Sequence, residues 1–569
     1  MTRSVQIVER MRWMSALAGA AIVALAVGIV LAMSSGQLRA IVPGSSSAPA
    51  PTAGGSSAPL DPRIATLAQH HPNASVEAIV QFNAPVSEAK AQADAKAHGR
   101  IIGNLPIIHG LAVQATAAQA RALATNMDVH AVSLNATVTP QSLPAGHLPM
   151  MPGSQSVSGD QLKTTFDQTL GVTPLWKFGV TGTGVGVAVI DTGIDGALPD
   201  FATTNGRDSR VIVTAVDNSQ ATTANDSYGH GTDVAGIIAG NGANRPAADP
   251  LHGQYIGVAP NANLISIKVA DETGSTTVLD VIYGLQFAIQ HQAQYNIRVV
   301  NMSLNAATPQ SYKTDPLDAA VESAWMHGLV VVASAGNRGT ASDAVQYAPA
   351  NDPYVITVGG VDENGTADPG DDSVASWSSR GTTQDGFQKP DVYAPGAHIV
   401  SVLAPNSDFA DSNCSGCVLA GGQYIQTSGT SMAAPAIAGL VADLLQVHPR
   451  WTPAQVKGVL TSPAVTGNGS VQEPNAVKAV LDWNPPVADQ GLTPSQLISA
   501  ATGSVNLSLA TWNLATWNRA TGDLRAGYAN SSYSCKTCAA NTGSAVSSSL
   551  ATWGLATWGV ATWNTASLK

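Results

Sequence analysis

Three short segments each carry a side chain that could take part in acid–base or nucleophilic chemistry. Asp191 ends an apolar run in "GVAVIDTGID", His230 lies between two glycines in "DSYGHGTDVAG", and Ser431 lies among small residues in "SGTSMAAP". A serine hydroxyl is a useful nucleophile only when a neighbouring base takes its proton, and an acid can orient that base. Each residue also has an ordinary structural interpretation, because Asp and Ser often cap turns and helices.

Short apolar runs alternate with helical patterns over about residues 173–482, and these elements must position the three side chains. The apolar runs cover residues 185–190, 264–269, 298–302, 329–333 and 354–358. Uninterrupted apolar strands separated by helices predict an α/β domain with a parallel sheet that is covered by helices on both faces. In such sheets functional residues collect at the carboxyl ends of the strands, and Asp191 directly follows the first apolar run.

The setting of Ser431 suits a nucleophile in a second respect. An apolar helical pattern, "AIAGLVADLLQ", begins a few residues after it. The first N–H groups of a helix have no partner within the helix, so they can stabilise negative charge that develops nearby. Ser is equally a common N-cap residue, so this segment alone does not decide between the two roles.

Taken together, the motifs resemble those of the subtilisin-like serine proteases, the subtilase family (peptidase family S8). The matching motifs are "VAVIDTGID", "GHGTDVAG" and "GTSMAAP" in this order, with "VVNMSLN", "VVVASAGNRG" and "KPDVYAPG" between them. The resemblance covers about residues 172–480. It implies a subtilisin-like fold and a serine-type endopeptidase that cuts polypeptides through an acyl-enzyme intermediate, with no cofactor required for the chemistry. The related sedolisins use a glutamate as base, and His230 argues against that group.

The resemblance also implies a role for each catalytic residue. Ser431 would attack the peptide, His230 would act first as base and then as acid, and Asp191 would orient the imidazole. Asn337, in "ASAGN", would join the Ser431 N–H in stabilising the oxyanion. Without the resemblance we would interpret Asn337 as a turn residue.

Two short segments are implied to flank the cleft and to pair with an extended substrate. They comprise Ser303, Leu304 and Asn305, and Ala335 with Gly336. Asn305 stands where many relatives carry glycine, so a primary pocket for large apolar residues is not assumed. Asp233 follows "GHGT" where relatives usually have His. We expect its charge to raise the pKa of His230, because a nearby negative charge favours the imidazolium.

The N-terminal residues predict export. Residues 1–33 carry three arginines before roughly 20 apolar residues, as in a cleaved signal peptide or an uncleaved single-pass membrane anchor. A linker rich in Pro, Ser, Gly and Ala follows over residues 34–62. Both interpretations place the rest of the chain outside the cytoplasm, as an extracellular or cell-surface protein.

Residues 63–140 are expected to form a small module with the order strand, helix, two strands, helix, strand. This is a ferredoxin-like α+β arrangement. The module resembles the subtilase propeptide of the inhibitor I9 type. That resemblance implies a zymogen that cuts itself in the junction at residues 141–170, and a propeptide that inhibits the catalytic domain, residues 171–482.

Residues 483–569 read as a linker and a repetitive tail. Ala-Thr-Trp recurs five times, at a step of five residues within each cluster. An odd step places neighbouring tryptophans on opposite faces of a strand, so short strands broken by turns fit better than one long element. The tail supports an alternative function, a surface-attached binding protein in which the protease domain is secondary.

The remaining composition restricts cofactors and partners. The net charge of −11, without a cluster of Lys and Arg, argues against nucleic acid as the main partner. Cys414/Cys417 and Cys535/Cys538 form two C-x-x-C pairs, which read as disulfides of open connectivity or as a zinc site, and export favours disulfides. The acidic stretch at residues 362–372 is a candidate for a structural calcium site, with a solvated loop as the alternative.

Overall fold

The computed structural model describes residues 57–83, 86–140, 165–249, 252–409, 418–419, 421–466 and 471–495. The N-terminal apolar segment, residues 141–164 of the predicted junction at 141–170, the four cysteines and the Trp-repeat tail lie outside these residues. The predictions made for them therefore stay predictions. Within the described part, one helix, Thr430–Val447, is long and apolar enough to cross a membrane, and 89% of it is buried inside the protein. It is a core helix of the domain described below.

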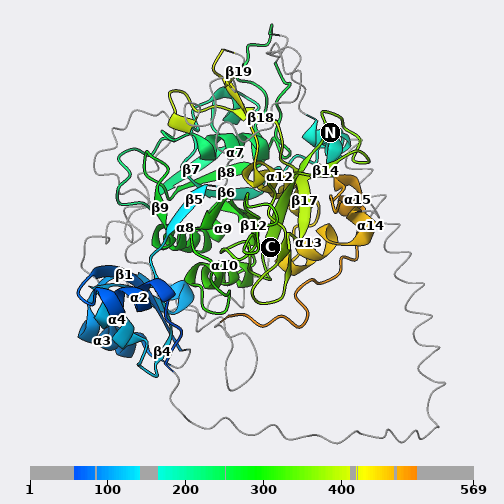
Figure 1. Cartoon of the computed structure of the whole chain (residues 1–569). Coiled ribbons are helices and arrows are strands. Elements are labelled where there is room, and N and C mark those ends of the chain that lie inside the picture. Colours follow the sequence, from blue (N-terminus) through cyan, green and yellow to red (C-terminus); the bar gives the residue numbers. More distant parts are fainter. Residues whose placement is uncertain are drawn as a thin grey trace, which may run out of the picture. The chain divides into compact units, whose positions relative to one another are not determined.

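The first described unit is the small module, drawn in blue in Figure 1. Its elements are α2 (Pro62–His70), β1 (Ser75–Phe82), α3 (Glu88–His98), β2 (Arg100–Leu105), η1 (Pro106–Ile108), β3 (Gly110–Thr116), α4 (Ala117–Leu123) and β4 (Val129–Leu134). The strands form an antiparallel sheet in the order β2-β3-β1-β4. This is the ferredoxin-like order that the sequence predicted. Helix α2 was not predicted; Asp61 caps it by accepting from the backbone N–H of Arg63.

The large domain is built on one eight-stranded sheet. Its strands are β6 (Gly186–Asp191), β7 (Val211–Val216), β8 (Asn263–Lys268), β10 (Ile297–Met302), β12 (Val330–Ser334), β13 (Ile356–Asp362), β14 (Ser373–Val374) and β17 (Val392–Pro395). Seven run parallel in the order β17-β13-β12-β10-β6-β8-β7, and β14 pairs antiparallel with β13 at the edge. All five predicted strands are present. Strand β7 was missed, because Thr214 interrupts its apolar pattern and Arg210 directly precedes it.

Helices cover this sheet on both faces, as predicted (Figure 1). Helix α12 (Thr430–Val447) crosses β10, β12, β13 and β17 and packs against α7 (His230–Ala239). Helices α8 (Val278–Gln290) and α10 (Pro316–Met326) pack together and contact β6 and β12. The remaining helices are α5 (Phe166–Thr169), α6 (Thr173–Trp176), η3 (Pro199–Phe201), α9 (Gln292–Tyr295), α13 (Pro453–Leu460), α14 (Pro463–Thr466) and α15 (Ala476–Leu481).

Three small sheets complete the large domain. Strands β15 (Gly381–Thr382) and β16 (Gln388–Lys389) pair with each other, and β18 (Ile399–Val402), β20 (Tyr424–Thr427) and β19 (Val418–Leu419) form the second sheet. The third has the order β11-β5-β9, with β5 (Thr137–Pro140), β9 (Thr276–Thr277) and β11 (Leu304–Ala306). Strand β5 follows directly on the small module but pairs only with strands of the large domain. The sequence predicted one continuous strand where the structure has β4 and β5.

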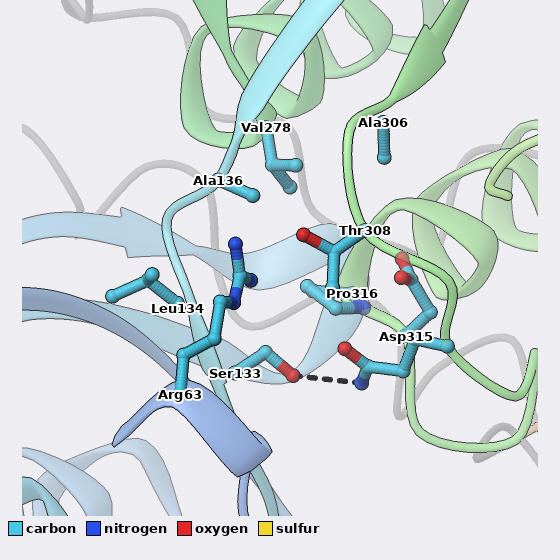
Figure 2. A pocket seen from close by; sticks show the side chains of 10 residues that line it. Arg63, Ser133, Leu134, Ala136, Val278, Ala306, Thr308, Asp315 and Pro316 are labelled. Atoms are coloured by element: carbon cyan, nitrogen blue, oxygen red, sulfur yellow. Dashed lines mark hydrogen bonds between the residues drawn. The ribbon is translucent and has the colours of Figure 1, made fainter. Parts of the chain in front are cut away.

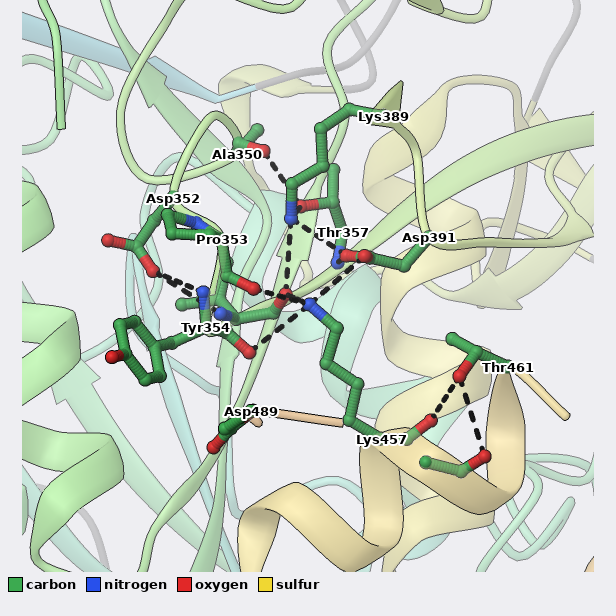
Figure 3. A network of polar contacts seen from close by, with 12 residues as sticks. Ala350, Asp352, Pro353, Tyr354, Thr357, Lys389, Asp391, Lys457, Thr461 and Asp489 are labelled. Atoms are coloured by element: carbon green, nitrogen blue, oxygen red, sulfur yellow. Dashed lines mark hydrogen bonds and ion pairs between the residues drawn. The ribbon is translucent and has the colours of Figure 1, made fainter. Parts of the chain in front are cut away.

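The "KPD" motif secures the end of the sheet through buried charges (Figure 3). Asp391 forms ion pairs with Lys389 at 2.8 Å and with Lys457 at 3.0 Å. Lys457 Nζ also donates to the backbone oxygens of Pro353 and Val355 at 2.8 Å each. These lysines hold the pKa of Asp391 below its ordinary value although burial alone would raise it. The network holds α13 against residues 353–355, which directly precede β13.

The small module is docked on α8 and α10 of the large domain. His130 Nε2 contacts Lys313 O at 2.9 Å. Gln310 Nε2 donates to Ser133 Oγ at 2.9 Å, which is the dashed line at Ser133 in Figure 2. Arg63 of α2 and Asp315, the N-cap of α10, line one small pocket at this junction (Figure 2). The docking brings β5 to its two partner strands.

Candidate active site

Asp191 and His230 are joined by a hydrogen bond at the carboxyl end of β6. His230 Nδ1 lies 2.7 Å from Asp191 Oδ1, and both side chains are almost fully buried. Asp191 is the last residue of β6 and His230 the first of α7, so the pair meets where a strand ends and a helix begins. A carboxylate can only accept, so Nδ1 carries the proton and Nε2 is the basic nitrogen.

The glycines around His230 allow α7 to begin so close to β6. Gly229 caps the helix with a φ of 105°, a backbone conformation that residues with a Cβ rarely adopt. A Cβ on Gly231 would collide with the carbonyl oxygen of Gly193. The spacing "GHG" is therefore a geometric requirement of the Asp191–His230 contact.

Asp226 holds this junction together, and sequence reasoning missed it. Its Oδ1 accepts from Thr192 Oγ1 at 2.8 Å and from Gly229 N at 2.7 Å. Its Oδ2 accepts from the N and Oγ1 of Thr232 at 2.8 and 2.7 Å. Thr192 Oγ1 in turn accepts from Gly231 N at 2.8 Å. An acidic residue four positions before a glycine-flanked histidine is the only sequence signal, and it reads equally well as a loop residue.

Negative charge gathers around His230. Burial alone would lower its pKa, but the charge and hydrogen bond of Asp191, with the charges of Asp233 and Asp226, outweigh burial and raise it. The contribution of Asp233 has the direction that the sequence predicted. Lys268 is the opposing cation: it is fully buried at the end of β8, and its Nζ donates to Thr192 O at 2.8 Å.

Ser431 lies in the first turn of α12 and is fully buried. Its Oγ donates to Ser303 O at 3.1 Å, while His230 Nε2 has no hydrogen-bond partner among the described residues. Pro435 has no N–H to donate to the Ser431 carbonyl, and Ser303 Oγ takes that place at 3.0 Å. Two reciprocal hydrogen bonds therefore fix the nucleophile to the residue that precedes β11.

Asn337 follows β12 and faces the start of α12. Its Oδ1 accepts from the N and Oγ1 of Thr430, at 3.0 and 3.1 Å. Because the amide oxygen is engaged with Thr430, the Nδ2 hydrogens point away from that contact. The structure thus brings Asn337 next to the residue before Ser431.

Strand β5 occupies the position of an extended peptide between β9 and β11. Pro140 lies opposite Leu304, Thr139 opposite Asn305 and Val138 opposite Ala306. On its other side Thr137 and Val138 lie opposite Thr277 and Thr276. Of the predicted segment at residues 303–305, Leu304 and Asn305 pair with β5, and β9 is a second pairing edge that the sequence analysis did not identify.

The other predicted flanking residues do not pair with β5. Ala335 N donates to Val358 O at 2.9 Å, and Gly336 N donates to Thr430 Oγ1 at 3.1 Å. Asn305 connects the two flanking segments, because its Nδ2 donates to Ser334 O at 3.1 Å and its side chain is buried. A glycine could not make this link.

The described residues contain no group of three or more His, Cys, Asp or Glu side chains that could hold a metal ion. The acidic stretch at residues 362–372 belongs to this part of the chain. Asn364 Nδ2 instead donates to Asp371 O at 2.7 Å, and Thr366 Oγ1 donates to Asp371 Oδ1 at 2.9 Å. These hydrogen bonds hold the stretch, and the calcium site stays a prediction.

The sequence of the chain is similar to those of known proteins. The sequence pattern described as "Peptidase_S8: Subtilase family" matches residues 182–483. The chain is 42% identical over 312 residues to serine protease AprX of Bacillus subtilis (strain 168). This alignment covers 52% of this chain and 67% of AprX. Subtilisin E of the same strain is 38% identical over 288 residues, covering 50% of this chain and 62% of subtilisin E.

A solved structure supports the fold. The crystal structure of fervidolysin from Fervidobacterium pennivorans, described as a keratinolytic enzyme related to subtilisin, aligns with a TM-score of 0.54 and 26% identity. The alignment covers 76% of this chain and 64% of fervidolysin, so it spans less than two thirds of that protein. The subtilisin-like α/β fold that the motifs implied is confirmed.

Proposed function

The chain belongs to the subtilase family of serine-type endopeptidases, and from this premise we propose that it hydrolyses peptide bonds with Asp191, His230 and Ser431 as catalytic residues. The observation that carries this assignment is the buried 2.7 Å contact between His230 Nδ1 and Asp191 Oδ1. It leaves a basic Nε2 on a histidine whose helix packs against the helix of Ser431. Polypeptides are the substrate class.

The reaction would begin when Ser431 Oγ leaves Ser303 O and turns to His230 Nε2. Such catalytic hydrogen bonds often form only once substrate is bound. Nε2 accepts the hydroxyl proton as Oγ bonds to the substrate carbonyl carbon, and Asp191 stabilises the imidazolium. The imidazolium then gives its proton to the leaving amine. In the second half of the reaction, water takes the place of the amine: His230 accepts a proton from water as the water attacks the acyl carbon, and returns it to Ser431 Oγ as that oxygen leaves.

The carbonyl oxygen of the substrate gains a full negative charge in this step. The Ser431 N–H at the start of α12 and the Asn337 Nδ2 hydrogens are the donors that we assign to it. Thr430 supports both groups, since it neighbours Ser431 in the chain and donates to Asn337 Oδ1. No metal or organic cofactor is needed for any of these proton transfers.

The position of β5 supports a zymogen in which residues 63–140 act as propeptide. Strand β5 fills the peptide site between β9 and β11, so the docked module would exclude other substrates. Its register also indicates where the chain would be cut. Strand β5 ends at Pro140 opposite Leu304, so one further residue would reach Ser303, whose carbonyl accepts from Ser431 Oγ. We assign the cut to the bond after Gln141, within the predicted junction.

Purification of the full chain and of Ser431→Ala tests this function. The wild type should yield a fragment that begins at Ser142, seen by intact mass spectrometry, while Ser431→Ala stays uncut. Ser428→Ala is the matched control, because Ser428 Oγ accepts from the backbone N–H of His398 at 2.8 Å and lies outside the proposed relay. Equal cutting in wild type and Ser431→Ala would contradict the proposal.

Export completes the proposal. The apolar N-terminal segment of the sequence would send the enzyme out of the cytoplasm, either as a cleaved signal peptide or as an anchor on the propeptide side of the cut. In the second case self-cleavage would release the mature enzyme from the membrane.

A further inference from the structure

The proposed mechanism does not use the side chain of Asp233, a carboxyl that is 0% exposed. It lies one helical turn after His230 on α7, and side chains three positions apart on a helix are neighbours. Its Oδ2 accepts from Thr427 Oγ1 at 3.0 Å. Its backbone oxygen accepts from Ser401 Oγ at 2.7 Å. Burying a charged carboxylate costs free energy, so the presence of Asp233 at this buried position calls for an explanation.

These contacts join the proposed base to the segment that carries the nucleophile. Thr427 is the last residue of β20, four positions before Ser431. Ser401 belongs to β18 and lies opposite Ile425 of β20. Asp233 therefore connects the first turn of α7 to the sheet from which the chain leads to Ser431.

The charged groups around His230 come from four places in the fold. Asp191 ends β6, Asp226 lies in the loop before α7, Asp233 lies in α7 itself, and Lys268 ends β8. Asp191 and Asp226 are held by hydrogen bonds from Thr192. Burial raises the pKa of Asp233 to about 7, so its charge changes in the pH range where a histidine titrates.

We propose that Asp233 is a positioning residue that acts through His230: it fixes the histidine helix against β20, and its ionisation adjusts how readily His230 gives up its proton. The inference rests on the proposed function. When Asp233 is ionised, it favours the imidazolium, so a higher pH is needed to free the base. When Asp233 is protonated, this contribution disappears.

A specific pH dependence follows from this coupling. Protonation of either group weakens proton binding at the other, so the two titrate as a coupled pair. The acidic limb of the rate profile in the wild type should therefore be broader than a single ionisation. Asp233→Asn keeps an oxygen that accepts from Thr427 but removes the charge. Its acidic limb should shift to lower pH by about 0.5–1 unit and become as steep as a single ionisation.

The test measures the second-order rate constant for fluorophosphonate labelling of the self-cleaved enzyme between pH 4 and pH 9. Labelling needs an active Ser431 and a neutral base but no knowledge of the natural substrate. The matched control is Asp200→Asn. Asp200 is also 0% exposed, its pKa is raised to about 6, and it accepts from Asn244 N, but it does not face His230.

The expected result is a shifted and steeper limb in Asp233→Asn and an unshifted limb in Asp200→Asn. Asp233→Ala should combine that shift with a slower maximal rate, since it also loses the contact with Thr427. If Asp233→Asn labels with the wild-type profile, the inference on Asp233 is wrong although the proposed function stands. If the wild type itself is not labelled, the proposed function fails first.

Discussion

The carboxylate of Glu322, fully buried in α10, accepts hydrogen bonds from the backbone N–H and the hydroxyl of Ser495, at 2.8 and 2.7 Å from its Oε2. The segment around Ser495 is tied to the same helix at two further points. Trp325 Nε1 donates to Asp489 Oδ2 at 2.7 Å, and Tyr312 Oη donates to Thr493 O at 3.1 Å. Residues 483–495, interpreted as linker from the sequence, are thus a strap on the large domain.

The strap predicts how far the chain can be shortened. A chain that ends at Asp482 leaves Glu322 buried without these donors, which costs about 1–3 kcal/mol for that group alone. Its melting temperature should fall by about 5 °C or more in the uncut Ser431→Ala background. A chain that ends at Ala500 keeps all three contacts and should have the same melting temperature as the full-length protein. Equal melting of the two truncated chains, measured by calorimetry, would refute the strap.

The acids around Glu322 predict that stability falls as pH rises. Burial raises the pKa of Glu322 and Asp318 well above the ordinary values, and that of Asp352 to about 7. Between their ordinary values near 4 and the folded values, the folded chain binds more protons than the unfolded chain. The stability that these three acids contribute is therefore fully present below about pH 4, and it is lost as the pH rises through 7.

Glu322→Gln tests this relationship, because the amide still accepts from Ser495 but cannot ionise. The melting temperature at pH 8 should rise by about 2–4 °C relative to the parent, with little change at pH 5. Calorimetry of Ser431→Ala with and without the substitution measures both values. A substitution that lowers stability equally at the two pH values would show that Glu322 is needed as a carboxylate.

Asn337→Ala should lower kcat about 10²–10³-fold with little change in KM, because the donor acts mainly on the charge of the transition state. Thr430→Val is the comparison. It removes a hydroxyl that supports Asn337 and Gly336 but leaves the amide in place, so its loss should be smaller. Steady-state kinetics on a peptide anilide separate the two constants, and a pure KM effect in Asn337→Ala would rule out the oxyanion role.

A substitution at Gly103 should weaken the docking of the proposed propeptide on the large domain. A Cβ at this position of β2 would collide with the Tyr283 hydroxyl on α8. Gly103→Ala should therefore dock the module less well and slow self-cleavage of the full chain several-fold. The double variant Gly103→Ala/Tyr283→Phe removes the colliding oxygen and should restore the rate, as followed by gel densitometry. Without rescue, the collision is not the cause of the defect.

The sequence predicted the framework better than the fine geometry. Unbroken apolar runs identify β6, β8, β10, β12 and β13, because strands covered on both faces have no polar side to confuse the pattern. Strand β7 was missed, since Thr214 and Arg210 lie in or beside it. The triad candidates were visible because each lies in a motif at the end of an element.

Other features depend on contacts between distant segments, which no local pattern encodes. The carboxylate of Asp226 looks like one more loop residue until the structure shows it bonded to Thr192, Gly229 and Thr232. The separation of β5 from β4, and its insertion between β9 and β11, likewise appear only in three dimensions. Of the predicted substrate residues, Leu304 and Asn305 pair with β5, whereas Ser303, Ala335 and Gly336 are bonded to other parts of the domain.

The most direct test of the account is to locate a fluorophosphonate adduct on the self-cleaved enzyme by peptide mass spectrometry. We expect one adduct, on Ser431, formed at least about 10³-fold more slowly in His230→Ala that added wild-type enzyme has cut at the junction, because the hydroxyl then has no base. An adduct on another serine, no adduct on a folded and self-cleaved chain, or an undiminished rate in His230→Ala would contradict it.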